Sequence, residues 1–266
     1  VDENMANAAR VHAVENGKEL ADFTMIAYGG AAPLHASRLC EKLDIDRLLI
    51  PPGAGVGAAI GFLRAPFGFE AVRGAFLRLS EFDADWTNEL IAELDAEAQR
   101  FAQAGAAELE LEREIKAYMR YQGQGWEIVV TLPDRDFVAA DATEIRRRFE
   151  DEYARLFGRA LDGLDIEIMT WSVQVRSKLT PPAAVAAVAA EKPCYSDERR
   201  RIFDAREQLF VDAAVFQRDE LESGDLISGP AVIIERETST IVTNRYQAIK
   251  QSDGCLLLRL KGKEHD

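Results

Sequence analysis

Two glycine-containing turns near the start of the chain are the best positions for ligand chemistry. Each follows a short apolar run, residues 23–28 and 47–50, and each precedes a helical pattern. Glycine lets backbone N–H groups approach a ligand closely, and a helix N-terminus favours negative charge. The pattern therefore predicts a nucleotide-binding edge. Its candidate cofactor-binding residues are Gly29, Gly30, Ala31, Gly53 and Gly55. The alternatives are a tight turn between strand and helix at Gly29-Gly30 and, as the favoured interpretation of Gly53 and Gly55, close packing of the helix on the sheet.

His35 is the titratable base nearest to this predicted edge, in a chain that has only three histidines. Its place in the first turn of a helical pattern makes it a candidate catalytic residue that would polarise a substrate carbonyl. Packing against the sheet is the alternative interpretation. Neither a GxSxG nucleophile elbow nor an HExxH motif occurs, so no other catalytic residue is assigned.

Two further polar groups have competing interpretations. Glu235 and Glu237 stand beside Thr238–Thr240, but no His or Asp lies at a spacing that would complete a metal site. We therefore predict a solvated strand edge there and assign no metal ligand. Arg120–Gln124 is the most polar stretch of an otherwise apolar hairpin pattern, which predicts either a buried hydrogen-bond network or an interface with a partner subunit.

The elements that position these residues fall into three parts. Residues 1–67 alternate between strand and helix patterns, which predicts an α/β unit with parallel strands and a ligand edge at their carboxyl ends. Residues 68–182 combine amphipathic helix patterns with long alternating strands, which predicts an α+β layer. Residues 183–266 contain short strand patterns separated by turns, which predicts a small all-β module. The low-complexity segment Thr180–Lys192 is expected to be a linker or an exposed crossover.

The composition argues against several classes of function. The formal charge of −14 and the pI of about 4.8 argue against binding to a nucleic-acid backbone. The three cysteines form no CxxC pair, which predicts free thiols in place of a disulfide framework or zinc knuckle. No apolar run approaches the roughly 18 residues that span a bilayer, and no signal peptide is visible. We therefore expect a cytoplasmic protein without membrane contact.

Motifs along nearly all of the chain resemble those of the hydantoinase A/5-oxoprolinase family. The stretch AYGGAAPLHA, a strand ending in Pro51-Pro52 and the run GAGVGAAIGFL occur in the family's order. The later segments that fit the same family are Arg120–Gln124, Tyr153–Gly158, Gly229–Ile234 and Thr238–Thr240.

The resemblance implies the end of an actin/hexokinase-like ATPase core, followed by an α+β layer and a small all-β C-terminal module. It implies part of an ATP-dependent hydrolase of cyclic amides such as hydantoin, N-methylhydantoin or 5-oxoproline. ATP and Mg²⁺ are the expected cofactors, bound mostly outside this chain. Because the chain starts at Val1 without Met, we interpret it as a C-terminal fragment that is inactive alone. The expected partners are the N-terminal ATPase half and a hydantoinase B-like subunit.

Two other functions stay open on the sequence. The resemblance extends to subunits of ATP-dependent carboxylases that act on ketones such as acetone and acetophenone. Alternatively, the chain is a non-catalytic scaffold and docking module for a larger subunit. An apolar face where the ATPase half would pack also predicts self-association of the chain.

Overall fold

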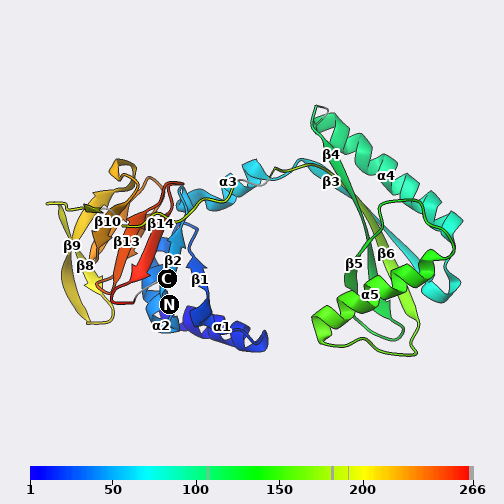
Figure 1. Cartoon of the computed structure of the whole chain (residues 1–266), viewed down its shortest axis with the longest axis horizontal. Helices are drawn as coiled ribbons and strands as arrows, with labels where there is room; N and C mark the ends of the chain where they lie inside the picture. Colours follow the sequence, from blue (N-terminus) through cyan, green and yellow to red (C-terminus); the bar gives the residue numbers. More distant parts are fainter. Residues whose placement is uncertain (107, 181–182, 191, 264–266) are drawn as a thin grey trace. The chain divides into compact units, whose positions relative to one another are not determined.

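The computed structural model describes residues 1–106, 108–180, 183–190 and 192–263. Within these residues the chain has a mixed α/β fold that contains three sheets (Figure 1). None of the helices that the structure describes is both long and apolar enough to cross a bilayer.

The chain folds into two compact units, which differ from the three parts expected from local patterns. Unit 1 joins Val1–Arg64 with Pro182–Asp266, and unit 2 consists of Ala65–Pro181. We expected 1–67 and 183–266 to form separate domains, whereas the structure combines them in one unit. Each unit has its own hydrophobic core, so the central segment is an insertion into unit 1.

The larger sheet of unit 1 is built from both ends of the chain. Its strands are β1 (Thr24–Ile26), β2 (Arg47–Ile50), β7 (Lys192–Pro193), β10 (Asp225–Ser228), β13 (Tyr246–Lys250) and β14 (Leu256–Leu260). Their order is β1-β2-β14-β13-β10-β7, and β1 pairs parallel with β2 as the sequence predicts. β14 pairs antiparallel with β2, and Figure 1 shows the red strand beside the blue one. An isolated two-stranded sheet is at best marginally stable, and the pairing with β14 removes this weakness from β1 and β2. This pairing is the physical reason why the first and last parts are not separate domains.

A second sheet and several helices complete unit 1. The sheet has the order β12-β11-β9-β8, and its strands are β8 (Arg199–Asp204), β9 (Leu209–Gln217), β11 (Ala231–Ile234) and β12 (Ser239–Val242). The helices are α1 (Asp2–Glu15), η1 (Leu20–Asp22), α2 (Ala32–Leu43), η2 (Ala54–Val56), α3 (Gly57–Arg64) and η4 (Arg218–Glu220). Helix α2 contacts both β2 and β12. The Ser37 hydroxyl donates to the Ile241 carbonyl at 2.6 Å, so α2 bridges the two sheets of unit 1.

Unit 2 is the α+β layer that the sequence predicts. Its antiparallel sheet has the order β3-β6-β4-β5, with β3 (Gly68–Arg78), β4 (Leu111–Tyr121), β5 (Ile128–Leu132) and β6 (Ile166–Ser177). Its helices are η3 (Leu79–Glu81), α4 (Ala84–Ala106) and α5 (Asp141–Phe157). Helix α4 packs on β3 and β6, and α5 packs on β5 (Figure 1). Helix α5 ends at Gly158, whose φ of 83° gives the left-handed cap expected of a glycine there.

Candidate functional site

The two glycine turns lie side by side at the carboxyl edge of β1 and β2. The Gly29 N–H donates to the Ala54 carbonyl at 2.6 Å, which ties the first turn to the second. Gly29 has a φ of 117° and Gly53 a φ of 66°, values that L side chains rarely adopt. The structure therefore brings together the glycines that the sequence singles out, at the edge where α/β sheets bind ligands.

Hydrogen bonding within the protein narrows the groups that a ligand can reach at the first turn. The Gly29 N–H is occupied by Ala54, and the Gly30 carbonyl accepts from the Thr238 hydroxyl at 2.7 Å. Ala31 is the N-cap of α2 and provides no side-chain cap. Within the described ranges, the N–H groups of Gly30, Ala31 and Ala32 have no hydrogen-bond acceptor. These donors, at the start of a twelve-residue helix, are open to an anionic or polar ligand.

Gly55 has a packing role in the structure. A Cβ atom at this position would lie 2.7 Å from the Glu237 Cβ and 2.8 Å from the Glu237 carbonyl oxygen. The turn between β11 and β12 thus approaches the second glycine turn closely enough to require glycine. Binding of a cofactor by Gly55 stays a prediction.

A cavity of about 560 Å³ opens beside Gly53. Its walls come from the second glycine turn, from the end of β9 with η4, from the β11–β12 turn and from β13, and its residues are Pro52, Gly53, Gln217–Asp219, Ile234–Glu237 and Lys250. Burial, and next the positive charge of Arg218, lower the pKa of the Lys250 ammonium group. In the part of the chain that the structure describes, no carboxylate forms an ion pair with Lys250.

Arg218 and Glu235 form a buried ion pair in the wall of this cavity. Their side chains are 5% and 11% exposed, and Arg218 Nη1 donates to Glu235 Oε1 at 2.7 Å. Arg218 Nη2 also donates to the carbonyls of Ile50 at 2.7 Å and Gly254 at 3.0 Å. The prediction of a solvated edge is therefore wrong for Glu235, although Glu237 is exposed as expected. No local signal marks Arg218, because its partners lie far away in the sequence.

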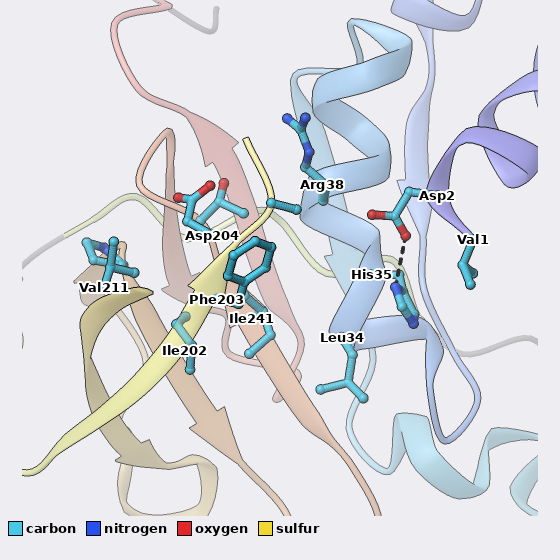
Figure 2. Close-up of a pocket in the computed structure, with 13 residues that line it drawn as sticks. Val1, Asp2, Leu34, His35, Arg38, Ile202, Phe203, Asp204, Val211 and Ile241 are labelled. Carbon is cyan, nitrogen blue, oxygen red and sulfur yellow. Dashed lines mark hydrogen bonds and ion pairs between the residues drawn. The ribbon is translucent and has the colours of Figure 1, made fainter. Parts of the chain in front are cut away.

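His35 lies on a different cavity from Gly53. Figure 2 shows this second cavity, of about 400 Å³, between α2 and the strand that carries Phe203 and Asp204. His35 Nδ1 lies 3.0 Å from Asp2 Oδ1 of α1, and its side chain is 38% exposed. None of the five glycine-edge candidates lines this cavity. His35 therefore does not line the cavity beside Gly53, and its catalytic role stays a prediction.

Tyr121 and Gln124 of the polar stretch Arg120–Gln124 take part in a hydrogen-bond network inside unit 2, whereas Gln122 is exposed. The Gln124 side chain accepts from the Tyr121 N–H at 3.3 Å and donates to the Tyr153 hydroxyl at 2.7 Å. The Tyr121 hydroxyl, fully buried, accepts from the Leu161 N–H at 3.0 Å, and burial raises the pKa of Tyr121. These bonds support the structural interpretation for Tyr121 and Gln124, and they link two of the segments that carry the family resemblance. An interface with a partner subunit stays a prediction for the rest of the stretch.

Comparison with known proteins identifies relatives along most of the chain. Residues 1–70 match the family model described as hydantoinase/oxoprolinase, and residues 82–261 match the model described as hydantoinase/oxoprolinase C-terminal domain. An uncharacterised protein of Methanocaldococcus jannaschii is 28% identical over 95% of this chain and 35% of its own length. Caprolactamase subunit alpha of Pseudomonas jessenii is 26% identical over 90% of this chain and 35% of its own length. The acetophenone carboxylase gamma subunit of Aromatoleum aromaticum is 27% identical over 94% of this chain and 35% of its own length.

Two solved structures have the same fold as this chain. A nucleotide-free structure of acetone carboxylase aligns with a TM-score of 0.70 at 20% identity, over 97% of this chain and 38% of that one. A crystal structure of the ATP-dependent caprolactamase from Pseudomonas jessenii aligns with a TM-score of 0.70 at 23% identity, over 98% and 39%. The chain therefore spans little more than a third of the length of each relative and structure named here.

Proposed function

Because the chain belongs to the hydantoinase/oxoprolinase family, we propose that it is the C-terminal part of an ATP-dependent subunit that hydrolyses a cyclic amide. The substrates in view are hydantoin, N-methylhydantoin, 5-oxoproline and related lactams. The similarity to caprolactamase subunit alpha supports this class of reaction. Since the chain covers 35% of that relative, catalysis by the complete subunit depends on residues outside this chain.

The single observation that carries the proposal is the contact between the two glycine turns. Gly29 and Ala54 join them at the shared carboxyl edge of two parallel strands. The open N–H groups of Gly30 and Ala31 at the start of α2 would hold the nucleotide through its polar groups. A Cβ at Gly30 would meet no atom within 4 Å, so this turn leaves room for a ligand. When bound, ATP would supply the phosphoryl group that activates the amide oxygen toward water.

The described residues provide no complete ligand set for magnesium. Within the described ranges, no group of three or more His, Cys, Asp or Glu side chains stands together in a way that could hold a metal ion. We therefore assign no magnesium ligand among these residues. The prediction that Mg²⁺ is bound mostly by the remainder of the subunit is kept.

Activation of a ketone for carboxylation is the second candidate. The 27% identity to the acetophenone carboxylase gamma subunit is the observation that favours it. In both candidates the glycine edge would bind ATP, and the substrate would be chosen by residues outside this chain. Partners, namely the N-terminal half and a hydantoinase B-like subunit, and a cytoplasmic location belong to the same proposal. The related proteins named as subunits support the expectation of partners.

Calorimetric titration of Mg-ATP into this chain and into the full-length subunit tests the proposal. Binding by both, weaker in this chain, is the expected result, because the glycine edge is one wall of the nucleotide site. Binding by the full-length subunit alone would indicate a scaffold and docking role for this chain. If neither binds Mg-ATP, the ATP-dependent assignment is wrong.

A further inference from the structure

The turn between β11 and β12 lies against both glycine turns of the proposed nucleotide edge. The Thr238 hydroxyl donates to the Gly30 carbonyl at 2.7 Å, although the two residues are 208 positions apart. One residue earlier, Glu237 lies against Gly55 closely enough to leave no room for a Cβ. A segment of the C-terminal region is thus in direct contact with the edge formed by the N-terminal region.

The position of this turn is fixed relative to β2. The Glu235 N–H donates to the Thr238 carbonyl at 3.0 Å and closes the turn. The Glu235 carboxylate is bound by Arg218, which also donates to the carbonyl of Ile50 at the end of β2. Because the backbone bond closes the turn and Arg218 ties the turn to the end of β2, Thr238 offers the Gly30 carbonyl a donor in a fixed position.

The first glycine turn needs such an anchor. Gly29 has a φ of 117°, Gly30 has open space around its Cβ position, and glycine is the residue with the most backbone freedom. The Gly29 N–H bond to Ala54 fixes the entry to the turn, and the Thr238 bond fixes the peptide that follows Gly30. That peptide carries the Ala31 N–H, one of the open donors, so the hydroxyl of Thr238 orients a group offered to the ligand.

We propose that Thr238 is a positioning residue for nucleotide binding, which acts by holding the Gly30 carbonyl and with it the Ala31 N–H. This inference rests on the proposed function of the glycine edge. Without the anchor, only a fraction of the molecules presents the N–H in its binding orientation, and the apparent affinity falls by that fraction. The β11–β12 turn then contributes to nucleotide binding in addition to connecting two strands of the C-terminal sheet.

Mg-ATP titration of the full-length subunit tests the inference with variants at one turn. Thr238→Val keeps the shape of the side chain and removes the hydroxyl, and we expect binding about fivefold weaker, the size of one ordinary hydrogen bond. Thr238→Ser restores the hydroxyl and should bind nearly as the wild type does. Thr240→Val is the matched control, because the Thr240 hydroxyl is buried and has no partner among the described residues. In turnover assays we expect a raised KM for ATP with a nearly unchanged kcat.

Two outcomes of the titration overturn the inference, and the binding of Mg-ATP by the wild-type subunit distinguishes them. If the wild-type subunit and Thr238→Val bind Mg-ATP equally well, the positioning role of Thr238 is wrong and the proposed function is unaffected. Wild-type subunit that binds no Mg-ATP overturns the proposed function and the inference with it. Hydrogen exchange of this chain without nucleotide gives a second readout: the amides of Gly29 and Leu34, which are hydrogen-bonded at this turn, should exchange faster in Thr238→Val than in Thr240→Val. Equal exchange in the two variants would contradict the anchoring on which the inference depends.

Discussion

Replacement of Arg218 is the sharpest test of how unit 1 is held together. Its guanidinium joins three segments, through Glu235, the Ile50 carbonyl at the end of β2 and the Gly254 carbonyl before β14. The side chain is 5% exposed and that of Glu235 is 11% exposed. Arg218→Met keeps much of the apolar volume but leaves a carboxylate buried without its cation.

The expected loss follows from this geometry. Removal of one partner of a buried ion pair costs about 3–5 kcal/mol, because the remaining charge is desolvated and unpaired. The two carbonyls lose their donors in the same step and keep the loss near the upper end of this range. In urea, a loss of about 4 kcal/mol over a slope of about 2 kcal/mol/M lowers the unfolding midpoint by roughly 2 M. The double variant Arg218→Met with Glu235→Leu should recover a large part of the loss.

The positions of the tryptophans allow the unfolding of the two units to be followed separately. All three tryptophans, Trp86, Trp126 and Trp171, lie in unit 2. Tryptophan fluorescence therefore follows unfolding of unit 2, whereas far-ultraviolet circular dichroism follows both units. We expect Arg218→Met to lower the midpoint of a circular-dichroism transition and to leave the fluorescence transition in place.

A surface pair gives the control for this experiment. Arg206 and Glu207 lie 3.6 Å apart with 47% and 59% of their side chains exposed, so Arg206→Met should change the stability by less than about 0.5 kcal/mol. A loss below about 1 kcal/mol for Arg218→Met would refute the reasoning, because it would mean that Glu235 is neither buried nor dependent on Arg218. An equal shift of the fluorescence transition would show instead that the two units do not unfold separately.

Three further predictions concern acid stability, thiol reactivity and the independence of unit 2. Hydrogen bonds from Arg135 lower the pKa of Asp141 from 3.8 to about 2, so the contribution of Asp141 to stability is present above pH 3.8 and is lost as the pH falls toward 2. The variant Asp141→Asn should therefore be less stable than the wild type at pH 7 and should lose less stability on acidification. Urea unfolding followed by tryptophan fluorescence measures both differences. Burial raises the pKa of the Cys40 thiol to about 12. A thiol-specific reagent at pH 8 should therefore label the half-buried Cys194 first and Cys40 only when the protein unfolds. Rapid labelling of Cys40 in the folded protein would contradict its burial. The excised segment 65–181 should fold alone with the fluorescence midpoint of the full chain, and a non-cooperative transition would show that it depends on unit 1.

Local chemistry was sufficient to predict most of the elements from the sequence. Apolar runs that end at glycine-containing turns predict β1, β2 and the helices that follow each strand. In the structure these elements lie close to their expected bounds. Helix α5 has apolar residues at three- and four-residue spacing and ends at Gly158, as predicted. The candidates at Gly29 and Gly53 were found in the same way, since positive φ and tight turns are properties of single residues and their neighbours.

Pairing across long distances was not predictable from such patterns. The patterns of β2 and β14 each indicate a strand, but nothing in either indicates that the two strands are neighbours. Arg218 resembles any exposed arginine in the sequence, and its burial depends on Glu235 and on the end of β2 arriving at one place. The hydrogen bond from Thr238 to Gly30 is hidden for the same reason. Site residues supplied by a distant segment are therefore the ones that a single sequence does not reveal.

The topology also decides which experiments can separate a nucleotide-binding role from a docking role for the C-terminal region. Deletion of residues 194–266 would remove β14 from the edge of β2 and take away Arg218 and Thr238 at once. Loss of ATP binding or of a partner after this deletion would then report the unfolding of unit 1, because the remaining pair of strands is too small to be stable. Thr238→Val and Thr240→Val differ in a single hydrogen bond and leave the sheet intact. A difference between these two variants is therefore evidence about the nucleotide edge that no deletion of the C-terminal region can provide.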